Sequence, residues 1–189
     1  KLMLDEHTLS SLPQLKWIAR IGSGMEIIDT GYCDKHQIKY FSSPNGIANA
    51  VAEHAMGMLL SLLHKIPKSF QEIKNRQWNR DENRGRELQN LTVGIIGYGH
   101  TGSAFAKKLS AFTNTILVYD KYKQKIEDTF VQEVTLAKLI EEADVISFHV
   151  PLATDTYHYF NEHMLNALKK NIILINTARG AVVDTQMLL

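Results

Sequence analysis

Cysteine is nearly absent from this sequence, since Cys33 is the only one among 189 residues. A disulfide within the chain is therefore excluded, and the composition fits a reducing compartment. An excess of either charge is also missing, because 21 basic and 20 acidic residues leave a formal net charge of +1. With no long basic run, nothing in the sequence points to a nucleic-acid partner.

Long hydrophobic runs and metal-ligand patterns are lacking as well. The most apolar stretch, residues 55–63, is far too short to cross a bilayer, and the N-terminus shows no secretory leader. We therefore expect a cytoplasmic protein without a membrane partner. The eight histidines form no H-E-x-x-H pattern, and Glu53-His54 has no second ligand one helical turn later. We expect no metal site.

The ends of the chain lack the usual start and stop signals. The sequence begins without Met and ends at Met187-Leu188-Leu189, inside an apolar segment with no helix stop signal. We therefore expect this chain to be a piece of a longer protein. Its length still allows one or two domains with real hydrophobic cores.

A glycine motif is the most informative feature that is present. Gly97, Gly99 and Gly102 fit G-x-G-x-x-G, between an apolar strand at 91–96 and a helical pattern at 103–109. In such a unit the first glycine permits a tight turn and the second lets the backbone approach a diphosphate. The third lets helix and strand pack closely, with the diphosphate at the helix N-terminus. The motif predicts a dinucleotide site, and the alternative is a plain βαβ turn without ligand.

Asp120 strengthens the dinucleotide interpretation. It ends the next apolar run, residues 115–119, at the spacing where a carboxylate accepts hydrogen bonds from both ribose hydroxyls. Further strands are predicted at 130–134, 144–149 and 171–176, with helices at 135–143 and 162–169. Strands that alternate with helices of this length imply a parallel sheet covered on both faces. A doubly wound dinucleotide sheet normally has six strands, and five are visible.

A second, smaller region precedes this sheet. The sequence predicts a strand at 15–21, a helix at 26–35, a strand at 38–41, and a break at Pro44-Asn45-Gly46. A long helix is expected from about 48 to 66, followed by a charged loop at 75–90. The apolar face of the predicted long helix is expected to contain Val51, Ala55, Met58, Leu59, Leu62 and Leu63. We place a domain boundary between residues 44 and 45.

Two strand ends carry candidate chemistry, because ligands bind at the carboxyl ends of parallel strands. His149 is either a catalytic imidazole or, as we favour, a hydrogen-bonded histidine at the end of its strand. Arg179 can clamp a carboxylate and polarise a carbonyl, and the alternative is a surface ion pair with Asp184. The turn Gly22-Ser23-Gly24 offers an anion-binding concavity or is a plain loop. Trp78 is either a surface arm or a local staple.

Several of these motifs, in order and spacing, resemble the D-isomer-specific 2-hydroxyacid dehydrogenases, particularly the D-3-phosphoglycerate dehydrogenase-like members. The matching segments are residues 20–29, 49–57, 93–102 with Asp120, 143–152 and 176–184. The resemblance implies an α/β fold: a Rossmann-type doubly wound parallel sheet, incomplete at its C-terminal side, in residues 45–189. Residues 1–44 would be part of a smaller flavodoxin-like substrate domain.

The resemblance also implies roles for individual residues. The turn that holds the diphosphate of NAD would be formed by Gly97, Gly99, His100, Thr101 and Gly102, and Asp120 would hold the adenosine ribose. Val150 would line the adenine side, and Thr177 and Ala178 would face the nicotinamide end. Ser23 and Arg179 would also contact the cofactor. Ser23 and Gly24 would contact the substrate carboxylate. Arg179 would be the catalytic arginine.

The implied activity is hydride transfer between NAD and a small D-2-hydroxy acid, with 3-phosphoglycerate first and glycerate/hydroxypyruvate second. A homodimer through the cofactor domain is expected. Two departures matter: Met25-Glu26-Ile27-Ile28-Asp29 replaces the family's usual segment, and the catalytic His and Glu would lie beyond Leu189. This chain alone is therefore expected to be inactive. The alternative is a non-catalytic NAD(H)-sensing regulatory or interaction protein. A bare nucleotide-binding module is disfavoured by Arg179 and Ser23.

Overall fold

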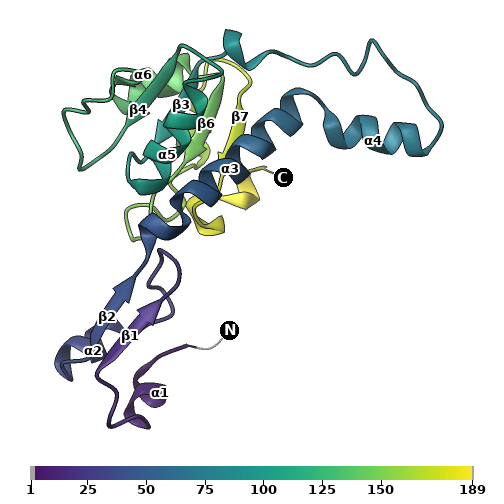
Figure 1. The fold of residues 1–189 in the computed structure, drawn as a ribbon. Coiled ribbons are helices and arrows are strands. Elements are labelled where there is room, and N and C mark those ends of the chain that lie inside the picture. Colours follow the sequence, from purple (N-terminus) through teal and green to yellow (C-terminus); the bar gives the residue numbers. More distant parts are fainter. Residues whose placement is uncertain (1–2, 189) are drawn as a thin grey trace. The chain divides into compact units, whose positions relative to one another are not determined.

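The computed structural model describes residues 3–188. They divide into two compact units, with the boundary between Asn49 and Ala50. Residues 3–49 are called the smaller unit and residues 50–188 the larger unit. Both are α/β, with parallel strands joined by helices (Figure 1). The boundary predicted between 44 and 45 falls at the first residues of helix α3 (Pro44–Leu63), the helix that the division crosses.

The smaller unit contains α1 (Glu6–Ser10), β1 (Trp17–Arg20), α2 (Thr30–Lys35) and β2 (Lys39–Ser42), and its two strands pair in parallel. The helix predicted at 26–35 begins only at Thr30, because the Asp29 carboxylate caps it by accepting from the Tyr32 N–H at 2.9 Å. Helix α1, which the sequence analysis missed, is capped in the same way by Asp5. The core of this unit is a cluster built on Leu9, Ile28, Cys33 and Ile38.

The predicted break at Pro44-Asn45-Gly46 is wrong, because these residues form the first turn of α3. Proline is accommodated in a first helical turn, where its missing N–H would have no partner within the helix anyway. The predicted apolar face of α3 is confirmed in part, because Ala55, Leu59 and Leu63 are buried but Leu62 is 55% exposed. The buried residues of α3 are Ala48, Ala52, Ala55, Met56, Leu59 and Leu63.

Helix α3 is, by length and composition, long and apolar enough to cross a membrane, which the nine-residue run at 55–63 did not suggest. One such helix is weak evidence, because the core helix of a folded domain passes the same test. Ala52, Ala55 and Leu59 are fully buried within the larger unit. Through these residues α3 packs against the sheet of the larger unit, while most of its other residues are partly or fully exposed.

The larger unit contains β3 (Val93–Ile96), β4 (Ile116–Tyr119), β5 (Gln132–Glu133), β6 (Val145–Phe148) and β7 (Ile173–Asn176). All pair in parallel, in the order β5-β4-β3-β6-β7. The five predicted strands are confirmed, each shorter than predicted. This is the order of the first five strands of a doubly wound sheet, in which the chain reverses its direction of progress between β3 and β6.

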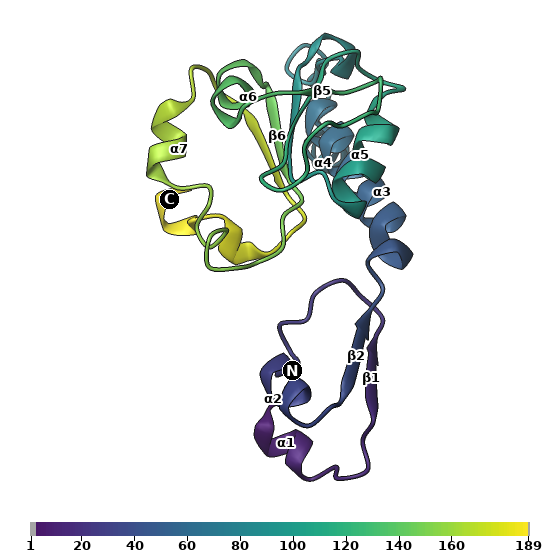
Figure 2. The same ribbon diagram turned by 90° about the vertical axis from the view of Figure 1, so that its left-hand side faces the viewer.

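Helices cover both faces of this sheet. Helices α3 and α5 (His100–Leu109) lie on one side, and α6 (Leu136–Glu142) and α7 (Glu162–Ala167) on the other (Figure 2). The first face buries Leu59, Phe105 and Leu109, and the second buries Leu139, Phe148 and Phe160. Burial on both faces explains why β3 and β6 consist of buried residues throughout.

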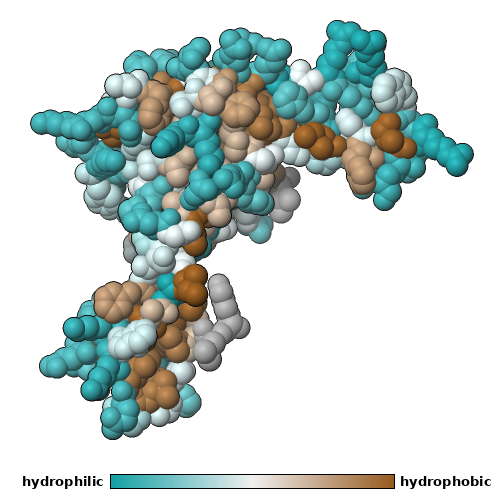
Figure 3. Space-filling model, viewed as in Figure 1, coloured by the Kyte–Doolittle hydropathy of each residue, from teal (hydrophilic) through white to brown (hydrophobic). Residues whose placement is uncertain are grey.

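A second helix, α4 (Ile66–Lys74), follows α3 and was missed by the sequence analysis. Lys65 separates the two helices with a left-handed backbone, φ 51°. Helix α4 contains no buried residue, and with the loop at 75–87 it projects from the sheet before the chain returns through the 3₁₀ turn η1 (Leu88–Asn90) (Figure 1). Residues 66–87 are called the arm. Hydrophobic side chains lie exposed along it (Figure 3). Trp78, 79% exposed, belongs to the arm, which fits its interpretation as a surface residue rather than a staple.

Candidate functional site

The glycine turn between β3 and α5 has the geometry that the motif predicts. Gly97 has φ 94°, and a Cβ there would lie 2.7 Å from the carbonyl oxygen of His149. A Cβ on Gly102 would lie 2.0 Å from the carbonyl oxygen of Gly97. These two positions need glycine for the turn and for close packing. Around Gly99, by contrast, a Cβ would meet no atom within 4 Å, so the turn leaves space beside its own backbone.

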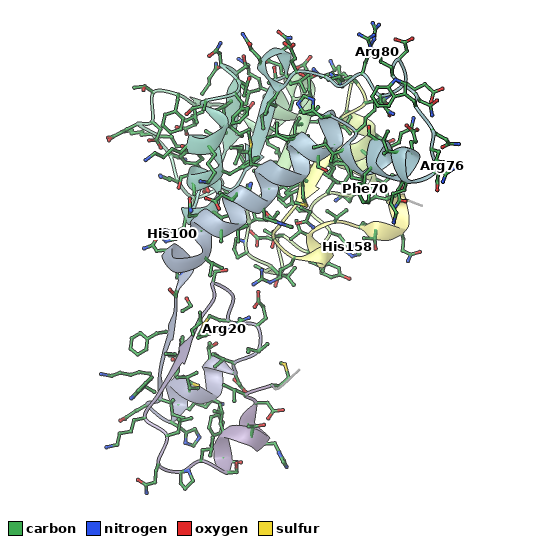
Figure 4. All side chains as sticks on the ribbon, turned by 45° about the vertical axis from the view of Figure 1, so that its right-hand side comes forward. Arg20, Phe70, Arg76, Arg80, His100 and His158 are labelled. Atoms are coloured by element: carbon green, nitrogen blue, oxygen red, sulfur yellow. The ribbon has the colours of Figure 1, made fainter. Side chains whose placement is uncertain are left out.

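The first turn of α5 faces this space with backbone N–H groups, as any helix N-terminus does. Gly99 is the N-cap, and His100, Thr101 and Gly102 are the first three helical residues. His100 is exposed and lies at the start of the helix (Figure 4). A helix N-terminus favours an anion, so the turn can hold a diphosphate.

Asp120 lies directly after β4, beside the turn. One carboxylate oxygen accepts from the Tyr98 N–H at 2.7 Å, and the other accepts from the Tyr122 and Lys123 N–H groups, both at 2.9 Å. Partial burial raises the pKa of Asp120, but these three backbone donors outweigh it and hold the pKa below its ordinary value. Asp120 is therefore an ionised acceptor next to the glycine turn.

The residues that follow β6 pack against the glycine turn. His149 donates to or accepts from the Ser147 hydroxyl through Nε2 at 2.8 Å, and its ring packs 5.2 Å from that of Phe105. Burial lowers the pKa of His149 to about 4, so the ring is neutral at physiological pH. This is the hydrogen-bonded strand-end histidine that we favoured over a catalytic one. Val150, next in sequence, lies against the turn, because its Cγ1 would be 2.9 Å from a Cβ on Gly97.

A tight turn follows β7. The Asn176 side chain accepts from the Ala178 N–H at 3.0 Å and donates to the Arg179 carbonyl at 2.8 Å, which fixes Thr177 and Ala178 at the end of the strand. The half-buried Arg179 guanidinium donates from Nη1 to the Ala178 carbonyl at 2.8 Å. Asp184, the alternative ion partner for Arg179, lies 3.6 Å from His158 Nδ1.

Ser23 and Gly24 lie in the smaller unit, in the loop after β1, where Ser23 is exposed. The Gly22 carbonyl accepts from the Ser43 N–H at 2.8 Å, which ties this loop to the residue after β2. An ion pair of 3.2 Å between Arg20 and Glu26 closes its base. Arg20 is seen at this position in Figure 4.

Within the larger unit, the structure brings the predicted residues to one edge of the sheet. The residues at this edge are Gly97, Gly99, His100, Thr101, Gly102, Asp120, Val150, Thr177, Ala178 and Arg179. Two buried polar atoms here, His149 Nδ1 and Thr177 Oγ1, have no hydrogen-bond partner within residues 3–188. Buried polar groups normally have a hydrogen-bond partner, so these two atoms fit an edge that binds a polar ligand such as a dinucleotide. No group of three potential metal ligands occurs among the described residues.

Two pairs of contacts at this edge were not predicted from the sequence. The Tyr98 hydroxyl donates to Asp128 at 2.8 Å, and Asp155 accepts from Lys121 at 2.5 Å and from the Tyr122 hydroxyl at 3.1 Å. Both contacts join residues 30 or more positions apart, so no local pattern signals them.

Comparison with known proteins identifies the fold's relatives. Residues 56–189 match the family description "D-isomer specific 2-hydroxyacid dehydrogenase, NAD binding domain". The chain is 36% identical to a glyoxylate reductase of Thermofilum pendens over 98% of this chain and 57% of that protein. It is 34% identical to a D-3-phosphoglycerate dehydrogenase of Bacillus subtilis, over 98% of this chain and 36% of that protein.

A solved structure agrees with the sequence relatives. The D-lactate dehydrogenase of Aquifex aeolicus, in complex with NAD and lactic acid, superimposes with a TM-score of 0.88 at 38% identity, over 98% of this chain and 56% of that one. The chain thus spans roughly a third to three-fifths of the length of these relatives. Its cofactor is NAD. The glycine turn, the ionised Asp120 and the parallel strand order all agree with this match, and the chain belongs to the D-isomer-specific 2-hydroxyacid dehydrogenase family.

Proposed function

We propose that the full-length protein transfers a hydride between NAD and a small D-2-hydroxy acid. The observation that carries this proposal is the position of Arg179. It lies three residues after the end of β7, at the same sheet edge as the glycine turn and Asp120. Cofactor binding alone does not require a guanidinium there, whereas a substrate carboxylate does.

The roles of the residues follow from their positions. Bound NAD supplies the hydride acceptor at C4 of its nicotinamide. In this proposal the turn residues 97–102 hold the diphosphate, Asp120 accepts from the ribose, and Thr177 and Ala178 face the nicotinamide end. Arg179 holds the substrate carboxylate and polarises the forming carbonyl, and Ser23 and Gly24 contact the carboxylate.

The general base is proposed to be a histidine, oriented by a glutamate, that lies outside residues 1–189. The strand-end histidine His149 is a poor base for this step, because its Nε2 is engaged by Ser147 and its pKa is about 4. The 189-residue chain on its own should then show no turnover, since loss of a general base alone removes about 10²–10⁴ in rate.

The substrate is proposed to be 3-phosphoglycerate, with glycerate/hydroxypyruvate as the second choice. Relatives of similar identity include a D-3-phosphoglycerate dehydrogenase and a hydroxypyruvate reductase, which supports both. The test is the full-length protein with NAD and each hydroxy acid, followed by NADH absorbance. Oxidation of at least one D-2-hydroxy acid supports the proposal. NADH binding without any turnover would instead identify an NAD(H)-sensing protein.

NAD is proposed to be preferred over NADP. The 2′-phosphate of NADP would lie against the Asp120 carboxylate, and like charges about 4 Å apart repel by roughly 1 kcal/mol in water and about 4 kcal/mol at a protein-surface dielectric. Calorimetry should therefore show weaker binding of NADPH than of NADH. Equal affinities would contradict the assignment of Asp120. A cytoplasmic location, where NAD and reduced thiols coexist, belongs to the same proposal.

A homodimer through the NAD-binding unit is also proposed, and the arm supports it. Ile66, Phe70 and Ile73 lie four and three residues apart on one face of α4 and are 54%, 61% and 53% exposed. Phe70 lies on this projecting helix in Figure 4. An apolar helix face of this kind in a soluble chain indicates a protein contact.

The arm is tested by Phe70→Glu in the full-length protein. Sedimentation velocity should show the variant shifted from dimer to monomer, because a carboxylate would have to be buried in the contact. Tyr157→Glu is the matched control, since Tyr157 is 59% exposed but lies outside the arm. A dimer that survives Phe70→Glu would place the contact elsewhere.

A further inference from the structure

The choice between NAD and NADP involves more than Asp120, because two lysines follow it in sequence. Lys121 comes directly after Asp120, which is proposed to accept from the ribose hydroxyls, and Lys123 follows two residues later. Cations at this position are what accommodates the 2′-phosphate of NADP in dinucleotide sheets. In the sequence alone, Asp120 favours NAD, whereas Lys121 and Lys123 would favour NADP, so the sequence does not decide between the two cofactors.

The structure shows both cations held by neighbouring groups. Lys121 Nζ lies 2.5 Å from an Asp155 carboxylate oxygen and 5.4 Å from the centre of the Tyr122 ring. The Tyr122 hydroxyl donates to that same Asp155 oxygen at 3.1 Å. Lys123 Nζ lies over the ring of the buried Tyr98, 5.0 Å from its centre. A lysine ammonium that is paired with a carboxylate carries little net positive field for a third group.

Asp155 holds Lys121 from a different part of the sheet edge. It lies in the loop that follows β6, whereas Lys121 follows β4. The Asp155 loop is itself fixed, because the buried Thr156 hydroxyl donates to the Pro151 carbonyl at 2.6 Å and accepts from the Ala153 N–H at 2.7 Å. Asp155 is thus presented to Lys121 by a loop of defined shape. The side chains of Lys121 and Asp155 remain 54% and 38% exposed, so a released lysine would be free to move in solvent.

We propose that Asp155 is a specificity-determining residue for the cofactor, which keeps Lys121 away from the position of a 2′-phosphate. This inference rests on NAD binding at Asp120 and extends it. Asp120 repels the phosphate directly, and Asp155 removes the cation that would compensate. The hydrogen bond from Lys121, with that from Tyr122, lowers the pKa of Asp155, so the carboxylate is ionised wherever the cofactor binds.

The test is Asp155→Asn in the full-length protein, with dissociation constants for NADH and NADPH measured by fluorescence titration at low salt. The ratio of the NADPH constant to the NADH constant should fall at least about fivefold, because Lys121 regains an unpaired charge near the 2′-phosphate. The fall should shrink as salt is added, since both groups are exposed. Glu141→Gln is the matched control: it removes another exposed lysine–carboxylate pair, that of Lys169 at 2.9 Å, and should leave the ratio as it is.

A double variant separates the proposed cause from the alternatives. In Asp155→Asn with Lys121→Ala, the gain in relative NADPH affinity should disappear. An unchanged ratio in Asp155→Asn would overturn the proposal, and so would an equal gain in the double variant. If both cofactors weaken equally, Asp155 only shapes the loop, and the proposal is again wrong. Failure of the wild-type protein to bind NADH would contradict the NAD assignment itself, which is a different result.

Discussion

The two units of this chain bury their hydrophobic residues to very different degrees. The smaller unit has a two-stranded sheet and one cluster built on Leu9, Ile28, Cys33 and Ile38. Its strand β1 leaves Trp17 62% exposed, and Ile21, just after the strand, is 96% exposed. The larger unit instead closes a five-stranded sheet between two layers of helices. A sheet of two strands is marginal without further packing, whereas a doubly covered sheet carries its own core.

The comparison explains where the strongest site geometry is found. The glycine turn and Asp120 depend on exact spacing between backbone atoms, and they lie on strands that are buried on both faces. The loop with Ser23 and Gly24 is attached to the thinner sheet. A rigid scaffold positions functional groups more precisely than a loop on a small core. We therefore expect the larger unit to dominate both cofactor binding and the chemical step.

The largest effect is expected from Arg179→Ala in the full-length protein, compared with Ser23→Ala. Loss of the guanidinium should lower kcat/KM by about 10²–10³, which is typical of removing one electrophilic donor. Ser23→Ala should lower it by about 10–10², because a single hydrogen bond to a charged group is worth about 1.5–3 kcal/mol. Steady-state kinetics with the best hydroxy acid measures both.

NADH affinity is the control for this pair of variants. It should change much less than turnover in Arg179→Ala, since the proposed partner of the guanidinium is the substrate. An equal loss of NADH affinity and turnover would make Arg179 a structural residue. A larger effect from Ser23 than from Arg179 would reverse the ranking of the two units.

The second prediction is that the stability of the larger unit depends on pH through His149, whereas that of the smaller unit does not. The pKa of His149 is lowered by burial to about 4, against about 6.5 in an unfolded chain. Between these values the unfolded chain binds a proton that the folded larger unit does not. The stability from this group is therefore complete above pH 6.5 and is lost as the pH falls towards 4, by about 3 kcal/mol in total.

Hydrogen exchange at pH 6.5 and 4.5 measures this loss. The opening free energy of β3 and β6 should decrease as the pH is lowered. In His149→Asn the opening free energy should depend less steeply on pH. His54→Asn, which changes an exposed histidine on α3, is the control and should leave the slope as in the wild type. If the opening free energy of β1 and β2 decreases between pH 6.5 and 4.5 as much as that of β3 and β6, the two units do not differ in the pH dependence of their stability.

The smallest effect in stability distinguishes two glycines of the same turn. Gly102→Ala places a methyl group 2.0 Å from the Gly97 carbonyl oxygen and should cost about 1–3 kcal/mol of unfolding free energy. Gly99→Ala meets no atom within 4 Å and should leave the unfolding free energy within about 0.5 kcal/mol. Its methyl group would fill the space beside the turn, so NADH affinity should fall about tenfold or more, or about 1.4 kcal/mol.

Urea unfolding and NADH titration of both variants test this pair. Full NADH affinity in Gly99→Ala would mean that the cofactor does not approach the turn. Full stability in Gly102→Ala would mean that α5 and β3 can move apart without cost.

Local patterns predicted most of the larger unit because its elements are regular. Strands buried on both faces appear as continuous apolar runs, and the turn between β3 and α5 needs glycine at fixed positions. The errors occurred where one signal has two meanings. Pro44 was interpreted as a break but begins α3, and the polar stretch after residue 66 concealed α4, whose apolar residues face outward. The predicted face of α3 differs from the buried one at Leu62, which is exposed, and at Ala52 and Met56, which are buried, because which side of a helix is covered depends on the elements that pack against it.

Sequence alone determined the family, the succession of the five strands of the larger unit along the chain, and the candidate site residues that follow those strands. These features follow from short-range periodicity and from turns that only glycine can make. The tertiary structure decided the charge state of the edge. Lys121 contacts Asp155, 34 positions away in sequence, and the buried His149 ring, beside Ser147 and Phe105, is neutral because burial lowers its pKa. Such contacts depend on which strands become neighbours, and desolvation depends on what covers a residue after folding.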